Sequence, residues 1–139
     1  GIAGHAGLFS NAYDLSLLYQ MLLNKGEFNG VRYLRPETVQ LFTAYNSKIS
    51  RRGLGFDKPE KDNLLRKDPY PASLSSPSTF GHTGFTGTCV WVDPQYDLVY
   101  IFLSNRVTPT RDNNKLSQLM IRGKIQDALY KALGADTHE

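Results

Sequence analysis

The sequence contains a single cysteine in 139 residues, which excludes an internal disulfide. Cys89 lies in an apolar stretch, and this favours a buried thiol. No run approaches the roughly 18 apolar residues of a membrane-spanning helix. No pair of histidines, cysteines or carboxylates has metal-ligand spacing, and no phosphate loop or dinucleotide fingerprint occurs. We therefore expect no membrane span, no metal and no cofactor. His5 is interpreted as a structural hydrogen-bonding residue, and His138 in the tail is discounted.

The basic residues are not concentrated in one part of the sequence either. The formal net charge is +3 and the pI is about 9.0, but the basic residues are scattered. The denser stretches are 48–52 and 58–67, and the second also contains acidic residues. This pattern favours a solvated face and no nucleic-acid partner. The chain opens on Gly1 instead of methionine, which we interpret as a processed or truncated start.

Residues 1–45 are predicted to be mainly helical. Asn11 is a suitable N-cap with Asp14 three residues later, and Gly26 is placed to end the helix. Asn29-Gly30 predicts a two-residue hairpin turn. Pro36 fits the first position of a second helix that fades near Tyr45. An apolar stripe predicts that the first helix is largely buried, and it consists of Leu15, Leu17, Leu18, Met21 and Leu22.

Residues 46–78 are predicted to be a long loop with a short strand at 53–56. A loop of this length either borders a site or is a poorly ordered insertion, and both readings stay open. Residues 79–105 follow as antiparallel strands, of which 88–92 and 98–103 are nearly continuously apolar and therefore covered on both faces. A last helix is expected over 114–133, beginning at Asn114 and stopping at Gly134. Its apolar face is Ile121, Ile125, Ala128 and Ala132, and Gly123 predicts close packing on the sheet.

This order predicts an α+β fold, a three-stranded antiparallel meander with flanking helices. Its most distinctive segment is the first strand, where Gly81, Gly84 and Gly87 surround His82 and Thr83. Glycine within a strand usually marks the close approach of another backbone or a ligand. A plain edge hairpin punctuated by glycine explains the same pattern, and the residues alone leave both readings open.

A resemblance enters with the motifs of the three strands. Gly-His-Thr-Gly-Phe-Thr-Gly at 81–87 is followed by an apolar strand ending Val-Asp-Pro and another ending Leu-Ser-Asn-Arg. This arrangement resembles the C-terminal part of the serine β-lactamase and penicillin-binding-protein superfamily, most closely its class C-like branch, which includes esterases and D-alanyl-D-alanine peptidases. The run 4–15, with a helix ending Leu-Leu-Asn-Lys-Gly, is similar to the helix that precedes the sheet in that branch.

The resemblance implies a single partial domain over 1–139 with a partial β-lactamase/transpeptidase-like fold. Family enzymes use a Ser-x-x-Lys nucleophile, a Tyr-x-Asn or Ser-x-Asn element, and a Lys-Thr-Gly strand. Only the third motif occurs here, with His82 in place of lysine. The chain then resembles the trailing half of a penicillin-recognising serine hydrolase without its nucleophile, which we expect to be inactive alone. A β-lactam, peptidoglycan-peptide or ester substrate and an extracytoplasmic or periplasmic location are also implied.

The resemblance also implies roles for individual residues. The N–H of Phe85 supplies one oxyanion donor, and Gly84 leaves room for the substrate along the strand. Thr83 hydrogen-bonds the substrate carboxylate or the catalytic network. His82 donates toward the tyrosine or serine pair, more weakly and with more pH dependence than a lysine.

Asn105 and Asn113 follow the last strand, where the family has further substrate contacts. In the family that strand pairs with an N-terminal strand, so strand 98–103 is expected to be an exposed edge that forms a homodimer or is covered by a partner. Two alternatives remain: a non-catalytic β-lactamase-like binding or accessory module fused to a cell-wall enzyme, and an unrelated small α+β binding domain.

Overall fold

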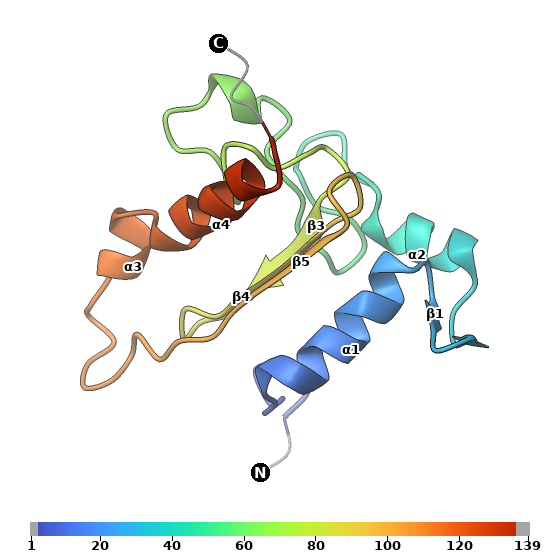
Figure 1. The fold of residues 1–139 in the computed structure, drawn as a ribbon. Coiled ribbons are helices and arrows are strands. Elements are labelled where there is room, and N and C mark those ends of the chain that lie inside the picture. The colour runs from blue at the N-terminus through green and yellow to red at the C-terminus, as the bar shows by residue number, and fades with distance from the viewer. Residues whose placement is uncertain (1–2, 136–139) are drawn as a thin grey trace.

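The computed structural model describes residues 3–135, so the expectations for Gly1, His138 and the tail 136–139 lie outside the described residues. Its elements are drawn in Figure 1. They are, in order, α1 (Ala12–Leu23), β1 (Glu27–Phe28), β2 (Val31–Arg32), α2 (Pro36–Thr43), the 3-10 helix η1 (Asn63–Leu65), β3 (Phe80–Thr83), β4 (Cys89–Asp93), β5 (Leu98–Phe102), α3 (Lys115–Gln118) and α4 (Ile121–Ala132). The expected α+β class is confirmed.

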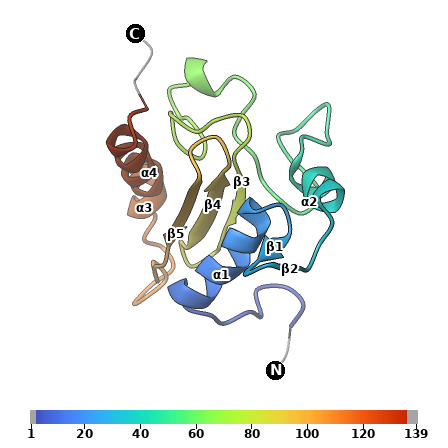
Figure 2. The same ribbon diagram turned by 45° about the vertical axis from the view of Figure 1, so that its right-hand side comes forward.

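The sheet is an antiparallel meander in the order β3-β4-β5. Its register places Gly81 opposite Trp91, and Trp91 opposite Tyr100. Figures 1 and 2 show α1 on one face of the sheet and α4 on the other. All five residues of β4 are buried, as its continuously apolar sequence predicts. Within residues 3–135, β5 pairs with β4 alone, so its other side is an edge.

Aromatic residues dominate the core on the α4 side of the sheet. Trp91 packs edge to face against Tyr70, with ring centroids 5.3 Å apart. The thiol of Cys89 is buried in the same cluster, as its apolar surroundings predict, and burial raises its pKa to about 11. Tyr130 of α4 centres a second cluster with Ala72, so the helix and the long loop share one core.

Helix α1 has the predicted ends but not the predicted burial. The Asn11 side chain accepts a hydrogen bond from the N–H of Asp14 at 3.0 Å, and Gly26 follows with φ +94°. However, no residue of α1 is buried, and Leu18 is 47% exposed. The prediction of a largely buried helix is therefore wrong. The helix packs mainly on β5, β1 and β4, and these contacts leave its apolar positions only partly covered.

Local signals place the next two elements correctly. Asn29 and Gly30 both have positive φ, 49° and 76°, as a type I′ hairpin turn between β1 and β2 requires. Pro36 is the first residue of α2, and Val39 is its buried residue. The helix ends at Thr43, two residues before the predicted fading point.

The C-terminal segment differs from the prediction of one helix over 114–133. The chain breaks between α3 and α4 at Met120, whose φ is +51°, and Asn114 makes no side-chain capping bond. Gly134 follows α4 with φ +84°, as expected of a helix stop. The buried residues of α4 are Gln126 and Tyr130 instead of the predicted apolar face.

The reason for this different face is that α4 packs on the long loop as well as on the sheet. A Cβ on Gly123 would lie 2.6 Å from the carbonyl oxygen of Pro71, so the predicted close approach exists, but it is to the loop. Asp127 accepts hydrogen bonds from the N–H groups of Ser73 and Leu74. Helix and loop are therefore joined by polar contacts that an apolar pattern does not reveal.

The long loop is irregular but extensively bonded. No strand forms at 53–56; instead Asp57 makes an isolated bridge to Gly81. The side chain of Asn63 donates to the carbonyl of Ala72 at 2.8 Å and accepts from the N–H of Tyr70 at 2.7 Å. These contacts favour a loop that borders a site over a poorly ordered insertion.

Candidate functional site: the outer edge of strand β3

The candidate site is built on the side of β3 that faces away from β4. Gly81 exchanges two backbone hydrogen bonds with Asp57 there, at 2.7 and 3.0 Å. Backbone groups alternate between the two sides of an antiparallel strand. Thr83 therefore faces the same outer edge as Gly81, while the N–H of Gly84 turns inward to the carbonyl of Thr88 at 2.8 Å. Phe85 follows in the turn that leads to β4.

The glycines are required by the sheet itself. A Cβ on Gly81 would lie 2.0 Å from the carbonyl oxygen of Val90, and one on Gly84 would lie 2.3 Å from the hydroxyl oxygen of Thr88. Gly87 has φ +96°, which a side chain would strain. The close approach expected from the glycine pattern is thus present, and at Gly81 the neighbour is a backbone.

Phe85 occupies the tip of the turn between β3 and β4 and is 65% exposed. Its carbonyl accepts a hydrogen bond from Nε of Arg106 at 2.9 Å, and that guanidinium lies 5.0 Å from the centre of its ring. Its N–H donates to no group within residues 3–135. A free, preoriented backbone donor of this kind can stabilise a developing oxyanion.

His82 has both ring nitrogens engaged. Nδ1 lies 2.7 Å from the carbonyl oxygen of Thr83, and Nε2 lies 3.1 Å from the guanidinium of Arg52. The outward donation expected from the resemblance is therefore not seen in this structure. Sequence reasoning also missed Arg52, which stands 30 residues earlier and carries no local signal of its position beside β3.

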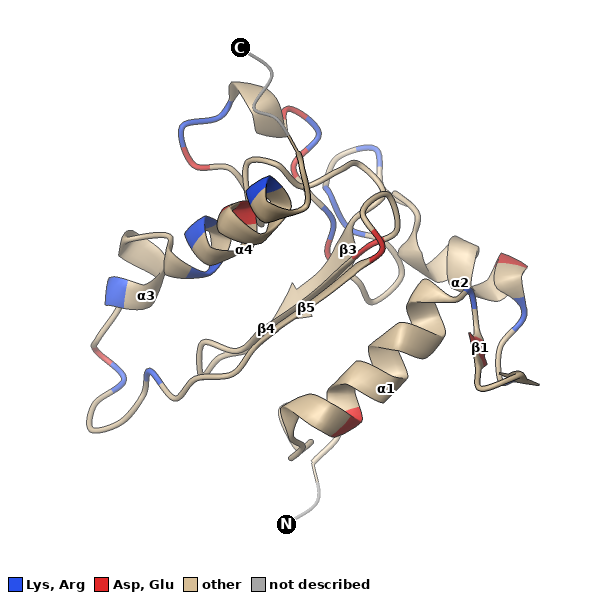
Figure 3. Cartoon of the chain, in the orientation of Figure 1, with Lys and Arg blue, Asp and Glu red and all other residues tan. Residues whose placement is uncertain are grey.

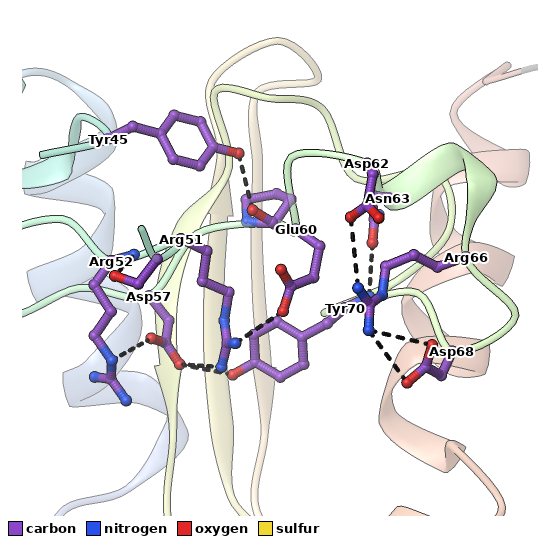
Figure 4. A network of polar contacts seen from close by, with 12 residues as sticks. Tyr45, Arg51, Arg52, Asp57, Glu60, Asp62, Asn63, Arg66, Asp68 and Tyr70 are labelled. Atoms are coloured by element: carbon purple, nitrogen blue, oxygen red, sulfur yellow. Dashed lines mark hydrogen bonds and ion pairs between the residues drawn. The ribbon is translucent and has the colours of Figure 1, made fainter. Parts of the chain in front are cut away.

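A buried carboxylate stands behind this pair. Asp57 accepts a hydrogen bond from the hydroxyl of Tyr70 at 2.8 Å and forms ion pairs with Arg51 and Arg52 at 3.5 and 3.2 Å (Figure 4). Burial, followed by the charge of Asp57, raises the pKa of Tyr70 to about 12. The phenol is consequently a hydrogen-bond donor, and not a base, at neutral pH.

Arg51 and Glu60 extend the same network along the loop, with a 2.9 Å ion pair. The network borders a cavity of about 350 Å³ that also reaches Thr83, α3 and α4. Its walls combine aromatic and apolar side chains with both signs of charge, including Arg66, Asp68, Trp91 and Arg122. Elsewhere the charged side chains are interspersed through the loops and α4, and the strands carry few of them (Figure 3).

Asn105 and Asn113 lie in the loop that follows β5, and both serve that loop. Asn105 donates to the hydroxyl of Thr108 at 2.8 Å, and the side-chain oxygen of Asn113 accepts from the N–H of Lys115 at 3.2 Å. Arg106 joins this loop to the turn at the end of β3 through the carbonyls of Phe85 and Arg111. The only sequence signal for Arg106 is that it ends the Leu-Ser-Asn-Arg motif after an apolar strand. That signal does not predict that its side chain contacts the turn at Phe85.

Comparison with known proteins assigns the family. Residues 1–123 match the model of the family described as Beta-lactamase. The chain belongs to this family. It is 36% identical over 131 residues to an Escherichia coli K12 protein named "Putative D-alanyl-D-alanine carboxypeptidase", and 33% identical over the same length to a protein of that name from Salmonella enteritidis. Each match covers 94% of this chain but 30% of the relative, so the chain spans about a third of its relatives' length.

A crystal structure titled "putative beta-lactamase" from Bacteroides dorei is also similar, with a TM-score of 0.49 and 12% identity over 86% of this chain and 44% of that chain. Family membership supports a serine hydrolase relationship for this chain. In residues 3–135, no helix combines the length and apolarity needed to cross a bilayer. The same residues hold no group of three or more metal-ligating side chains.

Proposed function

We propose that this chain forms one wall of the acyl-transfer site of a class C-like, penicillin-recognising serine hydrolase. The observation that carries the proposal is the N–H of Phe85, which donates to no group within residues 3–135 and belongs to an exposed turn directly after the His-Thr-Gly motif. The backbone of Thr83 faces the outer edge of β3, and Gly84 adds no side chain between Thr83 and Phe85. The edge can therefore accept an extended acyl group.

The proposed chemistry is nucleophilic attack by a serine on a carbonyl carbon, which makes a tetrahedral oxyanion. One donor to that oxyanion is the N–H of Phe85, and the other is the N–H of the attacking serine. Thr83 binds the substrate carboxylate or the catalytic network. Asn105 and Asn113 border the substrate through the loop that Arg106 fastens to the Phe85 turn.

The nucleophile is proposed to belong to residues other than these 139. No Ser-x-x-Lys, Tyr-x-Asn or Ser-x-Asn occurs among them, and the relatives are about three times as long as the matched segment. The chain alone is then inactive toward nitrocefin and p-nitrophenyl esters. In the whole protein, a β-lactam, a peptidoglycan peptide or an ester is the proposed substrate, in an extracytoplasmic location and without a cofactor.

The test is a chimera of the Escherichia coli relative in which this chain replaces the matching segment. Acylation by a fluorescent penicillin is followed by gel and stopped-flow, with the unaltered relative as the positive control. Phe85→Pro removes the N–H, whereas Phe85→Ala keeps it. We expect Phe85→Pro to slow acylation by about 10²–10³ and Phe85→Ala to have a small effect.

A chimera that folds, as judged by circular dichroism, but is not acylated would contradict the proposal and favour the non-catalytic accessory module.

The exposed edge of β5 supports a second, separate proposal. We propose that the isolated chain pairs this edge with a second copy, because five consecutive apolar residues lie along it. Sedimentation velocity across a concentration series decides the point, and a monomer at high concentration contradicts it.

A further inference from the structure

The segment that holds Arg52 is docked on the outer edge of β3. Asp57 exchanges two backbone hydrogen bonds with Gly81, the residue that precedes His82. The carboxylate of Asp57 lies 3.2 Å from Nε of Arg52, and Nη1 of the same guanidinium lies 3.1 Å from Nε2 of His82. A buried carboxylate, a guanidinium and an imidazole therefore form a chain that ends on the motif strand.

These contacts determine where the imidazole carries its proton. A guanidinium only donates hydrogen bonds, so Nε2 of His82 must offer its lone pair to Arg52. A carbonyl oxygen only accepts, so Nδ1 must donate its proton to the carbonyl of Thr83. Both contacts specify the same species, a neutral imidazole protonated on Nδ1.

We infer that Arg52 is the positioning residue of the motif strand, that it holds His82 in the neutral Nδ1–H form, and that its own guanidinium supplies the positive charge beside Thr83, Gly84 and Phe85. An imidazole with both nitrogens engaged presents no charge to a substrate. The guanidinium remains protonated at every pH at which proteins fold. This inference rests on the proposed function only in calling the edge of β3 a catalytic wall.

The burial of the three groups fits this division of roles. The side chain of Asp57 is almost inaccessible, while that of Arg52 is 53% exposed. Asp57 is held from behind by the hydroxyl of Tyr70 and by Arg51, so it anchors Arg52 from the protein side. The open side of the guanidinium is then available to an anionic group that approaches the β3 edge.

The first test measures the tautomer directly on the full chain, without any activity. Two-bond 1H–15N correlation spectra of 15N-labelled protein at pH 8 show which ring nitrogen of each histidine carries the proton, and His82→Gln assigns the His82 signals. We expect the Nδ1–H tautomer for His82. In Arg52→Met we expect it to be replaced by the Nε2–H form or by a mixture, and in Arg52→Lys, which keeps a donor, to be retained in part.

Arg66→Met is the matched control, because Arg66 pairs with Asp62 and Asp68 on the same loop. It should leave the His82 signals unchanged. An Nε2–H tautomer or a mixture in the unaltered protein would overturn the inference. An unchanged Nδ1–H tautomer in Arg52→Met would also overturn it, because the Thr83 carbonyl alone would then be sufficient.

The second test uses the chimera described above. Arg52→Met should reduce acylation by a fluorescent penicillin about tenfold, as expected for one lost charge-assisted contact, and Arg52→Lys should restore part of the rate. An unchanged rate in Arg52→Met would overturn the role of the guanidinium charge. The tautomer spectra do not depend on turnover, so a failure of the proposed function and a failure of this inference give different results.

Discussion

Asp57 and Asp93 are both 1% exposed, yet they are surrounded by opposite kinds of partner. Asp93, at the end of β4, accepts hydrogen bonds from neutral groups, including the hydroxyls of Ser76, Thr79 and Tyr130 at 2.6, 2.8 and 2.7 Å. Asp57, on the outer edge of β3, faces two guanidiniums in addition to one hydroxyl.

The difference separates a carboxylate with neutral hydrogen-bond donors from one that pairs with arginines at the candidate site. The neutral donors around Asp93 come from the long loop, the turn after β4 and α4, so this residue of β4 fastens the loop and α4 to the sheet. The side chains of Arg51 and Arg52 around Asp57 are 29% and 53% exposed, and Arg51 also pairs with Glu60. A buried acid whose charged partners reach the surface is an arrangement found at functional sites as well as in structural ion-pair networks.

The largest effect is expected for Asp93→Asn. The amide presents two donors to a ring of donors and removes a buried charge, and breaking such a network costs about 3–5 kcal/mol. Urea unfolding followed by circular dichroism measures the change. Asp97→Asn is the control, since Asp97 is exposed with φ +50°, a conformation that asparagine tolerates. A loss below about 1 kcal/mol for Asp93→Asn would contradict the structural role assigned to this carboxylate.

Lys58 provides a pH test of the same region. Burial lowers its pKa from 10.5 to about 8, although the charge of Asp93 opposes the shift. The unfolded chain then binds more protons than the folded chain between pH 8 and 10.5, so this group makes stability rise with pH across that window. The full effect amounts to about 3 kcal/mol.

Urea unfolding at pH 7.5, 8.5 and 9.5 measures this rise as a difference between the unaltered chain and Lys58→Met, because Cys89 and Tyr70, whose pKa values folding raises, lower stability with pH in both proteins. Lys58→Met should flatten the slope, and Lys48→Met, at an exposed position, should leave it unchanged. Equal slopes in Lys58→Met and the unaltered chain would show that another group titrates.

Asp57→Asn should lower the free energy of unfolding by about 1–3 kcal/mol, less than Asp93→Asn does. The reason is that the partly exposed arginines can be solvated when the charge of Asp57 is removed. Its more informative effect is on the neighbouring site. With the anchor of Arg52 weakened, the Nδ1–H tautomer of His82 should become partly mixed in the 15N spectra. Asp93→Asn, where it folds, should not alter that tautomer. A larger loss of stability for Asp57→Asn than for Asp93→Asn would reverse the assignment of the two carboxylates.

The two carboxylates also show what sequence patterns predict in this chain. Three local features form as predicted: the Asn11 cap, the Asn29-Gly30 turn and the Gly134 stop. Each depends only on residues a few positions apart in the sequence. The apolar sequences of β4 and β5 also predict the meander, because the two strands are neighbours in the sequence. The break at Met120 carries no such signal, and it stands three residues before Gly123, where α4 closely approaches the long loop.

The motif 81–87 identifies the candidate strand, but not its surroundings. Asp57 reaches Gly81 from 24 residues away in the sequence, and Tyr130 reaches Asp93 from 37. Nothing in the local pattern distinguishes Arg52 from the other basic residues of the loop. Long-range polar pairing of this kind depends on the assembled fold, so the partners of His82 become visible only in three dimensions.

The smallest expected effect comes from deleting one hydroxyl in each network. Tyr130→Phe leaves Asp93 short of a donor and the buried Nε2 of Gln126 without its acceptor, and should cost about 1–2 kcal/mol. Tyr70→Phe leaves Asp57 with its arginines, which can move closer, so a loss of about 0.5–1 kcal/mol is expected. Both rings keep their edge-to-face contacts, Tyr130 with Tyr96 and Tyr70 with Trp91, so each substitution isolates the hydroxyl. Equal losses in urea unfolding would mean that charged and neutral partners stabilise a buried carboxylate alike in this fold, and the distinction drawn between the two networks would fail.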